Sequence, residues 1–324
     1  MKKRVMCMLL TGVMAAGMFA GCGNSDTADT TTDAAATTDA ASTADAADTT
    51  SEAAPAENAD FDHTSAIAVY SREDGSGTRG AFIELFGVEE KDESGEKVDN
   101  TTEEAIITNS TDVMLTSVAG DTYAIGYVSL GSLNDTVKAV KIDGAEATVE
   151  NIKSGTYKIA RPFNIATKGE VSEAAQDFIN YIMSGDGQKV ISDNGYIGDD
   201  SAAAFESNGA EGKVVVGGSS SVSPVMEVLA DKYKELNSGV TIEIQQTGSG
   251  AGIQSTTEGV CDIGMASREL KDEETSQGLK SEEIALDGIA VIVNNDSPVT
   301  NLTSQQVKDI FTGVSAVWSD VLGE

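Results

Sequence analysis

Three loops rich in glycine and serine each follow a strand-like apolar run and precede a helical pattern. They are Ser71–Phe82 (SREDGSGTRGAF), Gly217–Ser221 and Thr247–Gly252. Each loop would place the amino terminus of a helix, with its unpaired N–H groups and partial positive charge, at the end of a strand. Glycine lets the backbone approach a ligand, and serine or threonine adds hydroxyl donors. If the three termini converge, they form a binding site for a small oxyanion.

The rest of the chain alternates strand-like runs with helical patterns, which is typical of an α/β fold. Apolar residues at helical spacing predict helices over 171–182 and 222–236, with their apolar faces in the core. Thr303-x-x-Gln306 has the pattern of a capping box that opens a further helix. We expect strands at 67–70, 124–128, 213–216, 241–246, 262–266 and 289–293.

The amino terminus predicts export and anchoring. Basic residues at 2–4 precede an apolar run over 5–20, which is shorter than a membrane-spanning helix of about 20 residues and is typical of a secretory signal. The run ends in Phe-Ala-Gly-Cys22, which resembles a bacterial lipoprotein box with Phe in place of the usual Leu. We expect residues 1–22 to be a lipoprotein signal peptide, cleaved before Cys22, whose sulfur carries the lipid. An ordinary signal peptide with an incidental cysteine is the alternative.

Residues 23–63 consist mainly of Ala, Thr, Asp, Ser and Glu. This composition cannot bury enough apolar surface to offset the ordering entropy, so it predicts a disordered acidic tether. Cys7 would leave with the signal and Cys22 would be lipidated, so Cys261 has no partner and no disulfide is expected. His63 is the only histidine, which excludes a His-based triad or zinc cluster. We expect no metal and no cofactor.

The chain is strongly acidic, with 21 basic and 53 acidic residues and a formal net charge of -32. Such a charge disfavours nucleic acid and anionic membrane surfaces as partners. An anion site must therefore be local. Each charge-assisted hydrogen bond contributes about 1.5 to 3 kcal/mol, and micromolar affinity needs about 8 kcal/mol. A handful of donors and one arginine are therefore sufficient.

Two other interpretations of the first loop fail on context. Gly75-x-Gly77-x-x-Gly80 has the spacing of a dinucleotide loop, but roughly 20 residues further on, where an acidic residue should end a second strand, the chain has the charged segment 91–97. A nucleophilic serine lacks a histidine base, and none of the three loops contains a Ser-x-x-Lys motif that would supply a lysine. We therefore do not expect an enzyme. For any one loop taken alone, a tight turn with a solvated serine cap remains the alternative.

Four motifs in one chain carry a family resemblance. They are Arg72–Thr78 (REDGSGT), Gly218–Pro224 (GSSSVSP), Gly248–Gly252 (GSGAG) and Asp262–Arg268 (DIGMASR). Together they resemble the phosphate-binding lipoproteins of bacterial phosphate ABC transporters, over about residue 64 to the end. The resemblance implies a monomeric solute-binding protein, lipid-anchored on the extracytoplasmic face of the cell membrane, that captures inorganic phosphate for a membrane permease. A binder of sulfate, molybdate or tungstate, or a surface or regulatory lipoprotein without transport, is the alternative.

The resemblance also implies a two-lobe, type II periplasmic-binding-protein-like α/β fold with two hinge crossings, near 161–163 and 287–289. One lobe would combine 64–160 with 290–324 and carry the REDGSGT loop, and the other would be 161–289. In the family's usual order the strand at Lys213 comes first and the REDGSGT loop comes later. The reversed order here predicts a circularly permuted chain, with 198–212 joining the old ends. A piece of a longer tandem array is the alternative.

The resemblance assigns the site residue by residue. Arg72 would supply the cation, and Asp74 would orient it. Asp74, Ser267 and Arg268 form a secondary set of possible binding residues. The well-known members have an Asp at the position of Arg268, and that Asp accepts the proton by which hydrogen phosphate differs from sulfate. Asp74, Asp262 or Glu269 would then have to be the acceptor, and discrimination against sulfate is open. The phosphate-binding residues implied are Arg72, Ser76, Gly77, Thr78, Ser220, Ser221 and Ser249.

Overall fold

The computed structural model describes residues 61–199 and 201–323. They fall in one compact unit that spans 54–324. The predicted signal peptide, Cys22 and the predicted tether as far as residue 60 lie outside the described residues. Within the described ranges, no helix combines the length and hydropathy needed to cross a membrane. Nor do these ranges contain a group of three or more His, Cys, Asp or Glu side chains placed to hold a metal ion.

Strands and helices alternate along the chain, as the apolar patterns predict. The strands are β1 (Ala68–Arg72), β2 (Glu89–Lys91), β3 (Lys97–Asp99), β4 (Ile106–Thr108), β5 (Ala124–Ser129), β6 (Val137–Ala139), β7 (Lys141–Ile142), β8 (Ala160–Lys168), β9 (Gly212–Gly218), β10 (Val240–Gln246), β11 (Ile263–Ala266), β12 (Leu279–Asn294) and β13 (Asn301–Leu302). The helices are α1 (Gly77–Leu85), α2 (Thr111–Ala119), η1 (Leu130–Ser132), α3 (Val149–Lys153), α4 (Glu173–Met183), α5 (Gly185–Asp193), α6 (Ser223–Leu236), α7 (Ser249–Thr257), α8 (Asp272–Ser276), α9 (Ser304–Phe311) and α10 (Trp318–Leu322).

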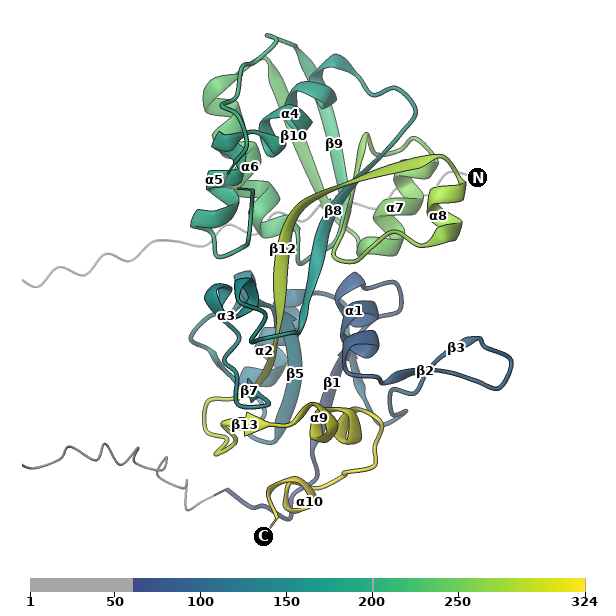
Figure 1. Cartoon of the computed structure of the whole chain (residues 1–324), viewed down its shortest axis with the longest axis vertical. Coiled ribbons are helices and arrows are strands. Elements are labelled where there is room, and N and C mark those ends of the chain that lie inside the picture. The colour runs from purple at the N-terminus through teal and green to yellow at the C-terminus, as the bar shows by residue number, and fades with distance from the viewer. Residues whose placement is uncertain (1–60, 200, 324) are drawn as a thin grey trace, which may run out of the picture. The chain divides into compact units, whose positions relative to one another are not determined.

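The main sheet has the strand order β10-β9-β11-β8-β12-β5-β1-β4, with β6 paired to β12. β9 is parallel to β10 and β11 at one end, and β1 is parallel to β4 and β5 at the other. Between them, β8 and β12 pair antiparallel and run side by side from one group of strands to the other (Figure 1). Asp287 pairs with Arg161 in this ladder, so the two predicted crossing segments are neighbours.

Each end of the sheet has its own hydrophobic core. One core surrounds β1, β5, α1, α9 and α10, where Phe82 stacks on Tyr127 with ring centroids 3.9 Å apart. The other lies among α4, α5, α6 and β9 to β11, and includes Phe178 and Tyr233. We call the elements around these cores the first lobe and the second lobe. Burial of about 25 cal/mol per Å² of apolar surface stabilises each lobe separately, while β8 and β12 connect them.

The beginning and the end of the described chain lie together in the first lobe. Phe61 is only 6% exposed, and its ring centroid lies 5.0 Å from that of Tyr123. The ordered fold therefore includes Phe61, and the tether boundary predicted at residue 63 is too late, because this aromatic side chain packs into the core. The Ile67 amide donates to the Ala316 carbonyl at 2.9 Å. A permuted chain requires such neighbouring ends; the permutation itself stays a prediction.

Candidate oxyanion site

Four helices begin where the two lobes meet. In the first lobe, α1 begins at Gly77 behind the N-cap Ser76, and α2 begins at Thr111. In the second lobe, α7 begins at Ser249, and α6 follows the serine loop 219–221. The first N–H groups of each helix lack an intrahelical acceptor and carry partial positive charge. Three of these termini are the predicted Gly/Ser loops, and the fourth, at Thr111, was not predicted.

Hydroxyl groups from these termini form a buried network, which we call the hydroxyl cluster. Thr78 Oγ1 lies 2.9 Å from Ser221 Oγ and 3.3 Å from Ser267 Oγ. Ser249 Oγ accepts from the Ser267 amide at 3.2 Å. All members are less than 9% exposed, and they come from both lobes. The cluster consists of Thr78, Thr111, Ser219, Ser220, Ser221, Ser249 and Ser267.

The structure thus brings together most of the predicted binding residues. Thr78, Ser220, Ser221 and Ser249 are all in the cluster, as is Ser267 from the secondary set. The Ser76 hydroxyl caps α1 by accepting from the Arg79 amide at 3.3 Å. An accepting hydroxyl keeps its hydrogen for another partner, so the cap leaves Ser76 able to donate.

Gly77 permits the close approach of the lobes. A Cβ atom at this position would lie 2.5 Å from Ser249 Oγ and 2.6 Å from Ser267 Oγ. Nonbonded heavy atoms without a hydrogen bond prefer separations of about 3.5 to 4.0 Å, so a larger residue would displace these two hydroxyls or the second lobe that carries them. Glycine is therefore required at position 77 because a Cβ atom does not fit between the lobes.

Arg72 ends β1 and is buried beside the cluster, with 2% of its surface exposed. Its Nε and Nη2 donate to the two carboxylate oxygens of Glu73 at 2.8 and 2.9 Å. Nη2 also donates to Ser220 Oγ at 3.1 Å. The prediction that Asp74 orients Arg72 is wrong: the Asp74 side chain is 97% exposed and pairs with Arg79 Nη1 at 2.9 Å. Glu73 takes this role because it directly follows β1, whereas Asp74 lies in the turn before α1.

Arg268 is held outside the cluster. Its Nη1 and Nη2 donate to the Glu274 carboxylate at 2.8 and 2.7 Å, and Nη1 also donates to the Glu269 carbonyl. Burial raises the pKa of Glu274, but hydrogen bonds from Arg268 and the Lys271 amide outweigh it and hold that pKa below its usual value. Arg268 is thus committed to an ion pair at α8, and it makes no hydrogen bond to the cluster among the described residues.

None of the three carboxylates considered as proton acceptors contacts the cluster in the described structure. Asp74 and Glu269 are exposed. Asp262 Oδ2 accepts from the Val215 amide at 2.8 Å, which fixes it between β9 and β11. The prediction that one of them replaces the missing aspartate finds no support in these contacts. Two carboxylates lie one arginine away from the cluster: Glu73 is paired with Arg72, and Asp287 is paired with Arg161.

Arg161 is a second arginine at the cluster that the sequence analysis did not single out. It lies on β8 with 3% of its surface exposed, and it forms an ion pair with Asp287 on β12. Its Nη2 donates to Thr78 Oγ1 at 3.0 Å, and its Nε donates to the Ser267 carbonyl at 3.3 Å. The available signal was the position of this arginine in the predicted hinge crossing at 161–163.

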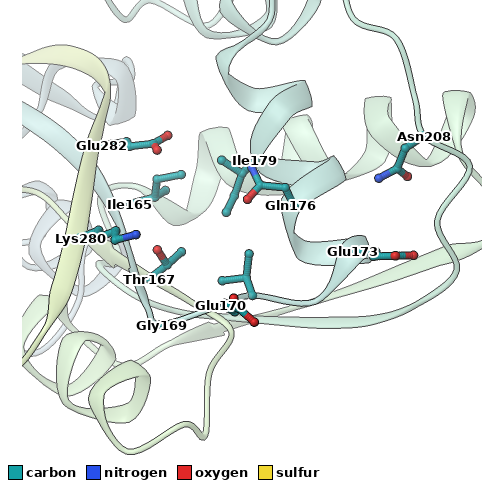
Figure 2. A pocket seen from close by; sticks show the side chains of 11 residues that line it. Ile165, Thr167, Gly169, Glu170, Glu173, Gln176, Ile179, Asn208, Lys280 and Glu282 are labelled. Atoms are coloured by element: carbon teal, nitrogen blue, oxygen red, sulfur yellow. The ribbon is translucent and has the colours of Figure 1, made fainter.

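A pocket of about 510 Å³ lies elsewhere in the second lobe, between β8, β12 and α4. Figure 2 shows Glu170, Glu173 and Glu282 around it, with Lys280 on its β12 side. No residue of the hydroxyl cluster lines it. Three carboxylates against one ammonium disfavour an anion, so this pocket is not the oxyanion site.

Comparison with known proteins agrees with this arrangement. A family model described as a PBP superfamily domain matches residues 52–186 and 203–324. The chain is 51% identical to phosphate-binding protein PstS 2 of Streptococcus agalactiae over 324 residues, which cover 99% of each chain. The chain belongs to the PstS family of the PBP superfamily. PstS 2 of Streptococcus pneumoniae is 46% identical over 259 residues, 80% of this chain and 88% of the relative.

A solved PstS-family structure shares the fold. The crystal structure of a phosphate-binding protein of a Streptococcus pneumoniae phosphate ABC transporter matches with a TM-score of 0.63 and 46% identity, over 79% of this chain and 100% of that chain. The predicted periplasmic-binding-protein-like α/β fold is therefore confirmed. The PstS family consists of binding proteins and not of enzymes. The Streptococcus agalactiae relative aligns along its whole length in the same chain order, so a permutation would be shared with it.

Proposed function

We propose that this PstS-family chain is an extracytoplasmic solute-binding protein that captures inorganic phosphate between its two lobes for an ABC importer. The observation that supports this most is the hydroxyl cluster, in which helix termini from both lobes converge beside Arg72. Its relatives are named phosphate-binding proteins. Membership of this family supports anion binding, and the hydroxyl cluster would supply the hydrogen-bond donors.

In this proposal Arg72 supplies positive charge, and α1 supplies the N–H groups of Gly77 and Thr78. The hydroxyls of Ser76, Thr78, Ser220, Ser221 and Ser249 complete the donor set. Each charge-assisted hydrogen bond contributes about 1.5 to 3 kcal/mol, so a few of them exceed the roughly 8 kcal/mol of a micromolar complex. Binding by both lobes would favour the closed arrangement, since β8 and β12 form a two-strand hinge.

The membrane context is also a proposal. Lipidation at Cys22 would anchor the protein to the outer face of the cell membrane, and the 23–60 segment would connect the anchor to the folded unit. The protein would act as a monomer that hands phosphate to a membrane permease. The proposed division into lobes is 64–160 plus 290–324, extended at its beginning to include Phe61, for the first lobe and 161–289 for the second.

A different oxyanion is the second candidate, and the position of Arg268 favours it. Because Arg268 replaces the aspartate of well-known members and is bound to Glu274, no carboxylate at that position can accept the proton of hydrogen phosphate. A site of donors alone does not penalise sulfate, molybdate or tungstate. A surface or regulatory role without transport is the alternative if no oxyanion binds.

Calorimetric titration of the mature chain, from Cys22 onward, with phosphate and with sulfate tests the proposal. We expect one phosphate per chain, bound at least as tightly as sulfate. A preference for sulfate would replace phosphate by the second candidate, and absence of heat with either anion would contradict an oxyanion transporter. Thr78→Val, which removes a cluster hydroxyl, should weaken binding, whereas Asp74→Asn at the exposed turn should not.

A further inference from the structure

Arg161 connects three parts of the molecule. It stands on the hinge strand β8, contacts Thr78 of the first lobe, and contacts the Ser267 carbonyl of the second. On the hinge side it forms the ion pair with Asp287, and its Nη1 also donates to the Gly288 carbonyl at 3.0 Å. Every nitrogen of the guanidinium is therefore engaged, and Nη2 is the one that reaches the hydroxyl cluster.

The contact with Thr78 sets the direction of a hydrogen bond. A guanidinium group only donates, so Thr78 Oγ1 must be the acceptor in its bond with Arg161. A threonine hydroxyl has one hydrogen, and that hydrogen then remains to be donated to another partner. Ser220 Oγ is in the same situation, because it accepts from Arg72 Nη2 at 3.1 Å. Two arginines thus leave two cluster hydroxyls as donors.

Asp287 keeps Arg161 in place and charged. Its carboxylate is 1% exposed and also accepts from the Gly131 amide at 3.4 Å. A buried ion pair gains its stability from good geometry and from the additional hydrogen bonds around it. The guanidinium has these in the carbonyls of Asp287, Gly288 and Ser267. The hinge therefore fixes the position from which Nη2 meets Thr78.

We propose that Arg161 is a positioning residue of the oxyanion site, which acts through Thr78 by directing the threonine hydroxyl toward the anion as a donor. This inference rests on the proposed function, because the anion is the phosphate of that proposal. It separates the two buried arginines by role: Arg72 borders the site from the first lobe, and Arg161 supports the donor from the hinge. It also makes the hinge part of the binding machinery.

A double-mutant cycle on the mature chain tests this role, with inorganic phosphate as the probe and calorimetry as the measurement. Arg161→Lys keeps the charge but not the forked geometry, and should weaken binding by about tenfold, as should Thr78→Val. Because Arg161 acts through the Thr78 hydroxyl, adding Arg161→Lys to the Thr78→Val variant should lower the phosphate affinity by a further factor of about two or less. Arg268→Lys is the matched control, since Arg268 also pairs with a carboxylate but outside the cluster, and it should leave affinity unchanged.

The outcomes distinguish the inference from the function. If the unaltered chain binds phosphate and the two losses multiply in the double variant, Arg161 does not act through Thr78 and the inference is wrong. If the unaltered chain binds no phosphate, the proposed function fails and the inference with it. Should Arg161→Lys prevent folding, the same cycle with Asp287→Asn decides, because this near-isosteric change loosens Arg161 and should show the same coupling to Thr78.

Discussion

Substitution of Gly77 by alanine should abolish tight anion binding while the fold persists. The new Cβ would stand 2.5 Å from Ser249 Oγ, 2.6 Å from Ser267 Oγ and 3.1 Å from the Ser267 carbonyl carbon. Relief of these contacts, against a preferred separation of about 3.5 Å or more, requires the Ser249 and Ser267 hydroxyls to move away by about 1 Å, by rotation of the side chains or by displacement of the second lobe. Such a movement takes hydroxyl donors out of hydrogen-bond range. One lost charge-assisted bond weakens binding by about tenfold or more, and two by about 100-fold or more.

The assay is calorimetric titration of phosphate into the two matched variants Gly77→Ala and Gly80→Ala. Gly80 lies on the same helix, and a Cβ there would be 3.8 Å from Arg268 Cδ, an ordinary contact. Gly80→Ala should therefore bind like the unaltered chain, and alanine's higher helix propensity should not lower its stability. If the affinity of Gly77→Ala for phosphate is within about twofold of that of the unaltered chain, the close approach of the lobes at Gly77 is not needed for binding.

Three further predictions follow from individual contacts. Arg268→Ala should change phosphate affinity by less than about twofold, because Glu274 holds the guanidinium outside the cluster; a large loss in a titration would place Arg268 in the site. Burial raises the pKa of Asp177, but hydrogen bonds, including one from Tyr233, outweigh it and leave that pKa below its usual value. The ionised carboxylate therefore stabilises the fold above its unfolded-state pKa, and this stabilisation is lost as pH falls through the lowered pKa. Asp177→Asn should lower the melting temperature at neutral pH, with a gap that closes in acid; a gap that does not change with pH would contradict this. Cys261 is 4% exposed and burial raises the pKa of its thiol. In a chain whose Cys7 and Cys22 are replaced by serine, a disulfide reagent should therefore modify Cys261 only upon unfolding in urea, and immediate reaction of the native protein would refute its burial.

Regular patterns explain what could be predicted from the sequence. The apolar runs of β1, β5, β9, β10 and β11 are bounded by glycine or polar residues, and each predicted strand is present. The capping box at Thr303 is also present, with Gln306 as its partner. The helix termini at Gly77 and Ser249 follow strands in the pattern expected of an oxyanion site. These features depend on neighbouring residues along the chain, so the sequence displays them directly.

The residues that were missed depend on contacts between distant segments. Thr111 follows β4, a strand of three residues, which is too short to give a clear period. Arg161 contacts Thr78 across 83 positions of sequence, and nothing local indicates that partner. The choice of Glu73 over Asp74 as the partner of Arg72 depends on where β1 ends and in which direction each side chain leaves the backbone. A spacing pattern does not contain that direction.

A crystal structure of the mature chain grown with phosphate tests capture between the lobes most directly. We predict one phosphate ion at the hydroxyl cluster, within hydrogen-bond distance of Thr78 and Arg72 from the first lobe and of Ser221 and Ser249 from the second. A phosphate bound to one lobe only, or bound elsewhere with the cluster unoccupied, would contradict capture between the lobes.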